Sequence, residues 1–319
     1  MSILAVAVLA ACGGAPTPES AAALARAAAF DTPMPNQIEA HTHTGEESTD
    51  HVHLDAAEIT EEMEAAIVPS ELTIGPNRFA VGLFDANGQV VRDAKVHFHY
   101  YDLTNPQAPT LESHAEAVRL QTPDGTTVFA HEREFTRAGD WGVEIQARFA
   151  DGRAAIKRIS FTVLAESPTL KPGEVAPAAD TPTLASGASD LSQLTSAPSP
   201  NPALYNISLA EALANDLPTV LLFATPAFCQ TRFCGPAYEL FSELQQRYQG
   251  RANFIHVEVY TGLPNPASNN WEIAPAMAAF GLSTEPWLYL LDADGIVVYR
   301  VEGLFTTEEV ERHLQALLG

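Results

Sequence analysis

The segment FATPAFCQTRFCGP, residues 223–236, places Cys229 and Cys234 in a C-x4-C motif. The apolar run 219–223 precedes the motif, and the amphipathic stretch 237–248 follows it. These flanks predict a strand, a tight turn and the beginning of a helix. The N-terminus of a helix carries partial positive charge and unpaired N–H groups, so it stabilises a thiolate. The motif therefore indicates cysteine chemistry, namely attack on a disulfide or a peroxide, or the binding of a metal.

The two cysteines of this motif have different expected positions. A disulfide requires their Cα atoms to approach to about 4.4–6.8 Å, whereas residues five apart in a straight helix lie about 7.5 Å apart along its axis. Cys229 is therefore expected in the turn before the helix, as the more exposed thiol and the nucleophile. Cys234, in the first helical turn, is expected to resolve the mixed disulfide.

Helical and strand patterns alternate through residues 204–319 in the order α-β-α-β-α-β-β-α. Ser208-Leu-Ala-Glu211 is a capping box that begins the first helix. Alternation of this kind predicts an α/β domain. The predicted strands are 219–223, 253–260, 287–291 and 296–301, and the predicted helices are 208–215, 237–248, 272–280 and 306–318.

This order, with cysteines directly after the first strand, resembles the thioredoxin fold. The segment 283–295, STEPWLYLLDADG, is similar to the thioredoxin segment in which a cis-proline opens a strand that faces the cysteines. The resemblance covers 204–319 and implies that Pro286 is the cis-proline. It also implies that the backbone of Glu285 pairs with a bound substrate strand. A cis X–Pro bond is uncommon enough to be a deliberate feature of a fold.

The sequence departs from thioredoxin at three places. The cysteine spacing is longer, Phe228 replaces the tryptophan before the first cysteine, and Phe223 replaces the buried acid that accepts a proton. We expect Phe228 and Glu285 to contact substrate. His256 is the expected substitute proton acceptor, with Glu258 on the same face of its strand. The alternative for His256 is a hydrogen-bonded histidine of the core.

Two other families have related cysteine spacings. The peroxiredoxins related to bacterioferritin comigratory protein carry Thr-Pro-x-Cys-x4-Cys-Gly, and this chain is similar but shifted by one residue, since Pro226 stands where that family has its threonine. Copper chaperones of the Sco type use C-x3-C with a distant histidine, and no matching histidine is evident here.

The opening residues MSILAVAVLAAC have the apolar run and small residues of an export signal. Residues 9–12, LAAC, resemble the lipobox of bacterial lipoproteins, which implies a signal peptide over 1–11 and a lipid on Cys12. The alternative is an uncleaved N-terminus. With Cys12 lipidated, Cys229 and Cys234 are the remaining thiols and are expected to pair in an oxidising compartment. The expected location is the extracytoplasmic face of the cell membrane.

Residues 12–66 are rich in Ala, Pro, Thr, Glu and Asp, which predicts a tether with short helices near 20–30 and 56–66. The tether contains four histidines that suit Cu(II), Ni(II) or Zn(II). The alternative is a polar stretch with adventitious metal affinity. The histidines are His41, His43, His51 and His53.

Residues 67–165 alternate apolar and polar positions in short runs separated by turn signals, which predicts a β-sandwich. Ala138-Gly-Asp-Trp141 resembles a pattern of immunoglobulin-like domains in exported bacterial proteins. His97 and His99 share one strand face, and with His114 or His131 they are either metal ligands or part of a solvated surface. The predicted strands are 78–83, 94–100, 127–135, 141–149 and 155–163. The Pro-, Ser- and Thr-rich residues 166–203 predict a semi-extended linker.

The expected fold class is therefore multidomain, an all-β immunoglobulin-like sandwich followed by an α/β thioredoxin-like domain. The formal charge of −23 argues against a nucleic-acid partner, and no cofactor is expected. The favoured function is a thiol–disulfide oxidoreductase with a protein dithiol or disulfide client and an external reductant or oxidant. The alternatives are a copper- or metal-handling lipoprotein and a non-catalytic scaffold whose disulfide is structural. The sandwich is expected to act as a spacer or docking module.

Overall fold

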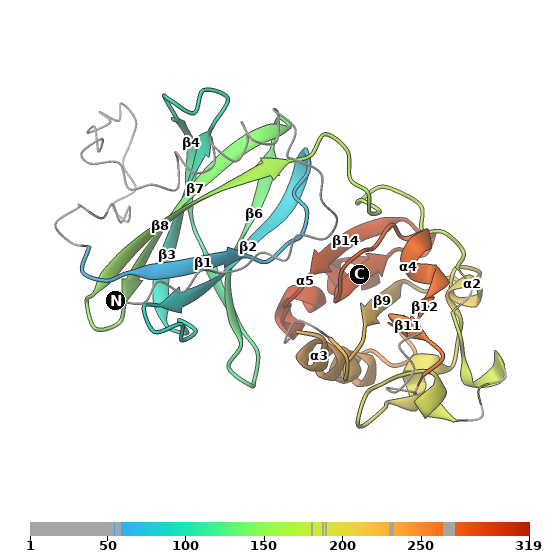
Figure 1. The fold of residues 1–319 in the computed structure, drawn as a ribbon. Coiled ribbons are helices and arrows are strands. Elements are labelled where there is room, and N and C mark those ends of the chain that lie inside the picture. Colours follow the sequence, from blue (N-terminus) through green and yellow to red (C-terminus); the bar gives the residue numbers. More distant parts are fainter. Residues whose placement is uncertain are drawn as a thin grey trace.

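The fold is taken from a computed structural model, which describes residues 54, 59–179, 181–186, 188, 190–229, 233–263 and 272–319. Cys12 and the four tether histidines lie outside these residues. The described chain forms a β-sandwich followed by an α/β unit (Figure 1). The multidomain, β-rich architecture predicted from the sequence is confirmed. No helix within the described residues is long and apolar enough to cross a membrane.

The sandwich consists of two four-stranded antiparallel sheets. Period-two alternation sorts its side chains, so that Phe98 and Tyr100 enter the core while His97 and His99 lie on the opposite face of their strand. The Phe79 and Phe98 rings meet edge to face at 5.3 Å in that core. In spatial order, the first sheet contains β1 (Met63–Ile67), β2 (Gly75–Asp85), β6 (Thr127–Phe135) and β5 (Val118–Gln121); the second contains β4 (Thr110–Glu116), β3 (Ala94–Asp102), β7 (Gly139–Phe149) and β8 (Ala154–Val163).

All five strands predicted for the sandwich are present, and β1, β4 and β5 are additional. β1 begins at Met63, so the predicted helix over 56–66 is wrong at its C-terminal end, and the sandwich begins before residue 67. Pairing with β2 makes this short segment a strand. β4 and β5 are edge strands in which most exposed positions, Val118 apart, carry polar residues, so their sequences lack a strong apolar pattern.

The α/β unit is built on a mixed four-stranded sheet in the order β10-β9-β13-β14, with β9 parallel to β10 and antiparallel to β13. Every residue of β9 is buried, as expected for a central strand covered on both faces. Helices α3 and α5 pack on one face, and α2 and α4 on the other. The strands are β9 (Thr219–Ala224), β10 (Asn253–Glu258), β13 (Trp287–Leu291) and β14 (Val297–Glu302); the helices are α2 (Leu209–Ala212), α3 (Cys234–Arg247), α4 (Pro275–Ala279) and α5 (Thr307–Leu318).

The predicted order of helices and strands is confirmed. A small hairpin, β11 (Tyr260–Thr261) with β12 (Glu272–Ile273), is inserted before α4, so the predicted helix over 272–280 begins only at Pro275. Helix α3 begins at Cys234, three residues earlier than predicted.

The composition of residues 166–203 predicts a linker, but this segment packs against the α/β unit. Its backbone bonds to that unit at Gly173, whose N–H donates to the Val297 carbonyl at 2.8 Å, and at Ala176, whose N–H donates to the Gly295 carbonyl at 2.9 Å. Threonines of the segment are buried, and the Thr181 hydroxyl accepts from the Leu209 N–H at 2.8 Å. The segment also forms the short helices η2 (Leu184–Ser186), η3 (Leu191–Gln193) and η4 (Pro202–Tyr205). The prolines of residues 166–203 favour an extended chain. Its threonine hydroxyls and backbone N–H groups nevertheless form hydrogen bonds with the α/β unit.

The sandwich contacts the α/β unit through buried ion pairs. Arg78 on β2 donates to the Glu309 carboxylate of α5 at 2.5 and 3.1 Å and to the Leu304 carbonyl at 2.8 Å. Arg300 on β14 lies 3.0 Å from Glu71. In Figure 1 the first sheet of the sandwich faces α5 and β14.

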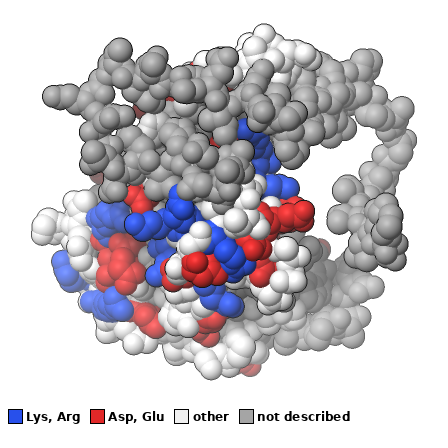
Figure 2. All heavy atoms as spheres, turned by 90° about the vertical axis from the view of Figure 1, so that its left-hand side faces the viewer, with Lys and Arg blue, Asp and Glu red and all other residues white. Residues whose placement is uncertain are grey.

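The charge of the chain is not gathered in one patch on the sandwich side. Figure 2 shows basic and acidic side chains interspersed on that face. Exposed or partly exposed ion pairs of the sandwich include Lys157 with Glu64 at 2.7 Å and Arg153 with Asp151 at 2.7 Å. Such pairs each contribute little stability.

Candidate functional site

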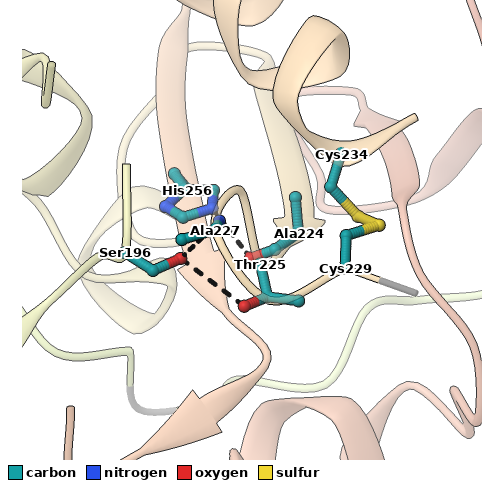
Figure 3. Close-up of a disulfide and its surroundings, with 7 residues drawn as sticks. All are labelled: Ser196, Ala224, Thr225, Ala227, Cys229, Cys234 and His256. Carbon is teal, nitrogen blue, oxygen red and sulfur yellow. Dashed lines mark hydrogen bonds between the residues drawn. A yellow bond between two sulfur atoms is a disulfide. The ribbon is translucent and has the colours of Figure 1, made fainter. Parts of the chain in front are cut away.

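Cys229 and Cys234 form a disulfide at the C-terminal end of β9 (Figure 3). Their Cα atoms are 6.0 Å apart, within the range that a disulfide spans. Cys229 lies in the turn and is partly buried, whereas Cys234 is the first residue of α3 and is fully buried. The predicted difference between the two thiols is therefore confirmed, with Cys229 the more accessible.

A short turn carries the chain from β9 to Cys229. The Thr225 carbonyl accepts from the N–H groups of Phe228 at 3.2 Å and Cys229 at 3.1 Å. Phe233 stands at the N-cap of α3 and offers no side-chain acceptor to the first turn. Cys234 thus lies at the N-terminus of α3, where the partial positive charge of a helix stabilises a thiolate.

The loop before β13 reaches the disulfide. The Glu285–Pro286 peptide bond is cis, as the resemblance implies, and β13 pairs with β9 so that Trp287 lies opposite Phe223. This register brings the Glu285 side chain to the cysteines: one carboxylate oxygen and both Sγ atoms all lie within 4.8 Å of one another. Burial raises the pKa of Glu285. The sequence predicts a backbone role for this residue and gives no signal for its side chain, since only the pairing of β9 with β13 places it.

His256 on β10 has both ring nitrogens engaged in the core. Nδ1 lies 2.8 Å from the Tyr205 hydroxyl, and Nε2 lies 3.0 Å from the Ala224 carbonyl. A carbonyl only accepts, so we assign the ring proton to Nε2, and the Tyr205 hydroxyl then donates to Nδ1. Burial lowers the pKa of His256 to about 3, so the ring is neutral at physiological pH. Figure 3 shows the ring on the other side of Ala224 from the disulfide.

The His256 bonds are one end of a longer chain. The Asn201 N–H donates to the Tyr238 hydroxyl at 2.9 Å, and the Tyr238 and Tyr205 hydroxyls are 3.2 Å apart. With the proton assignment above, each donor points toward the Ala224 carbonyl, the last of β9 before the cysteine turn. The chain joins the 166–203 segment, α3, β10 and β9, so no local sequence pattern could predict it.

Glu258, on β10, is linked to the cysteine turn through Ser196. Its Oε2 accepts from the Ser196 N–H at 2.8 Å, and the Ser196 hydroxyl accepts from the Ala227 N–H at 3.1 Å. Burial raises the pKa of Glu258, against hydrogen bonds with Thr225 and Ser196 that lower it. Its Oε1 is buried without a hydrogen-bond partner among the described residues. Figure 3 shows the Ser196 hydroxyl bonded to Ala227 and Thr225 of the turn.

The histidines of the sandwich do not form one cluster. His99 lies beside His114 across β3 and β4, with ring centroids 5.9 Å apart. His131 instead lies by Tyr100, with centroids 6.1 Å apart, on the opposite side of that sheet. Within the described part of the chain, Cys229, Cys234 and Glu285 are the one group of three or more potential metal ligands with atoms close enough to share an ion.

No protein-family model matches this sequence, and no curated protein matches it. A thiol:disulfide interchange protein DsbE from Chlorobium tepidum is similar in structure, with 14% identity and a TM-score of 0.31, over 47% of this chain and 100% of its own. CopC from Methylosinus trichosporium OB3b has 11% identity and a TM-score of 0.24, over 34% and 97%. The PmoD soluble domain from Methylocystis sp. ATCC 49242 has 17% identity and a TM-score of 0.23, over 32% and 90%. At these values the likenesses carry no argument about function, which rests on the geometry of the site.

Proposed function

We propose that this protein is a membrane-anchored, extracytoplasmic thiol–disulfide oxidoreductase of thioredoxin-like fold. One observation carries the proposal. A disulfide joins an accessible cysteine in a turn to a buried cysteine at a helix N-terminus, beside the loop that carries Glu285 and Pro286. A purely structural disulfide needs no such loop beside it, whereas a disulfide that exchanges with a client needs an exposed sulfur and a surface for the client.

In the reduced protein, the Cys229 thiolate attacks one sulfur of a client disulfide and releases the other client sulfur as a thiolate. The Cys234 thiolate then attacks Sγ of Cys229, which releases the second client thiolate and leaves the Cys229–Cys234 disulfide. Two electrons pass to the client, and an external dithiol restores the reduced pair. Oxidation of a dithiol client is the same sequence in reverse, with an external oxidant.

The remaining site residues have supporting roles in this proposal. Phe228 and the backbone of Glu285 contact the client segment, next to Pro286. The role of His256 as a proton acceptor stays a prediction. Its hydrogen bonds support a second role, in which the ring positions the Ala224 carbonyl at the start of the cysteine turn. Thiol exchange kinetics of a His256→Asn variant at several pH values separate the two roles. Loss of a proton acceptor changes the pH profile, whereas a displaced turn lowers the rate at every pH.

The reduction potential of the Cys229–Cys234 pair tests the proposal directly. The full chain is equilibrated with mixtures of reduced and oxidised glutathione, and its thiols are counted, with Cys229→Ser as the control for the remaining thiols. We expect a potential well above about −300 mV, the level below which structural disulfides usually lie. A pair that resists reduction in this range would favour the scaffold function.

The anchor is a separate part of the proposal and rests on the sequence around Cys12. Growth with a radiolabelled fatty acid is expected to label the protein and bring it to the membrane fraction. A Cys12→Ser variant is expected to lose both the label and the membrane association. Equal labelling of the variant would remove the anchor from the proposal and leave the exchange chemistry untouched.

Metal handling is a second candidate function, favoured by the grouping of Cys229, Cys234 and Glu285. Two thiolates and a carboxylate suit Zn²⁺, which catalytic sites often hold with three protein ligands and one open position, and two thiolates alone suit Cu(I). Titration of the reduced chain with Zn²⁺ against a chromophoric chelator tests this function, with the oxidised chain as the control. We expect Glu285→Gln to weaken binding by about tenfold or more and the exposed Glu272→Gln to leave it unchanged. Equal binding by both variants would exclude Glu285 as a ligand.

A further inference from the structure

The loop between β1 and β2 of the sandwich lies against the segment that carries Glu285 and Pro286. Ser70 in that loop donates to Oε2 of Glu302, from its N–H at 2.6 Å and from its hydroxyl at 2.9 Å. The other oxygen of Glu302 accepts from the Thr284 hydroxyl at 2.6 Å. One buried carboxylate therefore bridges the sandwich to the residue directly before Glu285.

The Thr284 hydroxyl has a second partner that fixes it. It accepts from the indole N–H of Trp287 at 3.0 Å, so Thr284 is held from both sides of the loop. The backbone is held as well, because the Gly303 N–H donates to the Pro286 carbonyl at 2.9 Å. The conformation of the loop thus depends on contacts with β14 (Val297–Glu302) and the residue that follows it.

A second sandwich residue, Val68, lies over the same place. A Cβ added to Gly303 would come within 2.6 Å of Cγ1 of Val68 and within 3.7 Å of the Phe233 ring. Phe233 directly precedes Cys234. Val68 of the sandwich and Phe233, next to the disulfide, therefore both lie close to Gly303.

Two buried ion pairs also cross the interface between the sandwich and the α/β unit. The side chains of Arg78 and Glu309 are each 6% exposed, and those of Arg300 and Glu71 are 11% and 6% exposed. Removing one partner of such a pair leaves a buried charge unpaired, so loss of either pair destabilises the interface. The spacer role that the sequence predicts for the sandwich does not require any of these contacts.

We propose that the sandwich is part of the substrate-binding machinery, with Ser70 and Glu302 as positioning residues for the Glu285–Pro286 loop. The inference rests on the proposed oxidoreductase function and deepens it. The client is an extended, disulfide-bearing polypeptide segment that lies on this loop, so its affinity depends on the Ser70–Glu302–Thr284 bridge. The chemistry at the two sulfurs does not depend on it.

Steady-state reduction of a short synthetic peptide with one disulfide tests the proposal, with the full chain as catalyst and dithiothreitol as the external reductant. Glu302→Gln replaces the charged acceptor of the bridge with an amide, whose NH2 group cannot accept, and Ser70→Ala removes the hydroxyl donor. We expect KM to rise by about tenfold and by about threefold, respectively. The values of kcat and of the Cys229–Cys234 reduction potential stay unchanged. Ser70→Thr retains the hydroxyl, and its KM is expected to equal that of the wild type.

Glu71→Gln is the matched control, because it disrupts the same interface through Arg300 without touching Thr284. We expect it to lower the melting temperature and to leave KM within about twofold of the wild-type value. Equal changes in KM for Glu71→Gln and Glu302→Gln would show a general effect of interface stability and overturn the proposal. An unchanged KM in Glu302→Gln would overturn it as well.

A wild-type chain that reduces no peptide disulfide would refute the proposed function but not decide the positioning role. Hydrogen exchange decides it in that case. Ser70→Ala is expected to reduce the protection of the Glu285 and Trp287 amides, while the amides in the middle of β13 keep theirs. Unchanged protection at Glu285 and Trp287 would overturn the positioning role.

Discussion

His256 provides a prediction about the stability of the α/β unit in acid. The ring is buried among Tyr205, Tyr238 and the Ala224 carbonyl, and its pKa falls from 6.5 to about 3. Both nitrogens are already engaged, so a second proton would break the bond from Tyr205 and place a charge in the core. The folded ring therefore stays neutral through mild acid.

The size of the effect follows from the two pKa values. Since the unfolded chain binds a proton near pH 6.5 and the folded chain does not, acidification favours the unfolded chain. At about 1.36 kcal/mol per pH unit, lowering the pH from about 7 to about 4.5 removes roughly 2.5 kcal/mol of folding free energy through His256 alone. This stability is fully present above the unfolded pKa and is lost as the pH falls toward the folded one.

Urea unfolding of the wild type and His256→Asn, at about pH 7 and about pH 4.5, measures this term. The variant loses stability at both pH values because Tyr205 and Ala224 lose a partner, a cost of about 1–3 kcal/mol. Its decline between the two pH values is expected to be smaller than that of the wild type by about 2.5 kcal/mol. All carboxylates are common to both proteins and cancel. Equal declines would refute the neutral, buried histidine.

Three further experiments test the packing around the site. Gly281→Ala is expected to destabilise the protein by more than about 3 kcal/mol in urea unfolding. The reason is that φ is +71° and the new Cβ would lie 1.9 Å from the Pro168 carbonyl oxygen. A cost under about 1 kcal/mol would show that the 166–203 segment does not pack there. Gly303→Ala is expected to lower the free energy of unfolding by about 1–3 kcal/mol, since φ is +79° and the new Cβ would meet Val68. Adding Val68→Ala is expected to recover part of this loss. Strictly additive losses in the double variant would argue against the Val68 contact. Tyr238→Phe removes the acceptor of the Asn201 N–H and is expected to cost about 1–3 kcal/mol, and an unchanged melting temperature would contradict the hydrogen-bond chain.

The sequence determined the local elements of this protein because their signals are local. The fully apolar run at β9, the capping box at Ser208 and the helical spacing after Cys234 each define an element without help from distant residues. The C-x4-C motif between a strand and a helix likewise predicted which thiol would be the less buried of the two. These features depend on neighbours within about one turn or one strand.

Only the tertiary structure decided the environment of the disulfide. The Glu285 carboxylate reaches the sulfurs through the pairing of β13 with β9, which places Trp287 opposite Phe223, 64 residues away in the sequence. The bridge from Ser70 to Glu302 joins residues 232 apart in the sequence. The predicted linker packs through backbone N–H and C=O groups, which are the same in every sequence and so give no signal of this packing. Contacts between distant segments depend on sheet order and domain orientation, which no periodicity in one segment encodes.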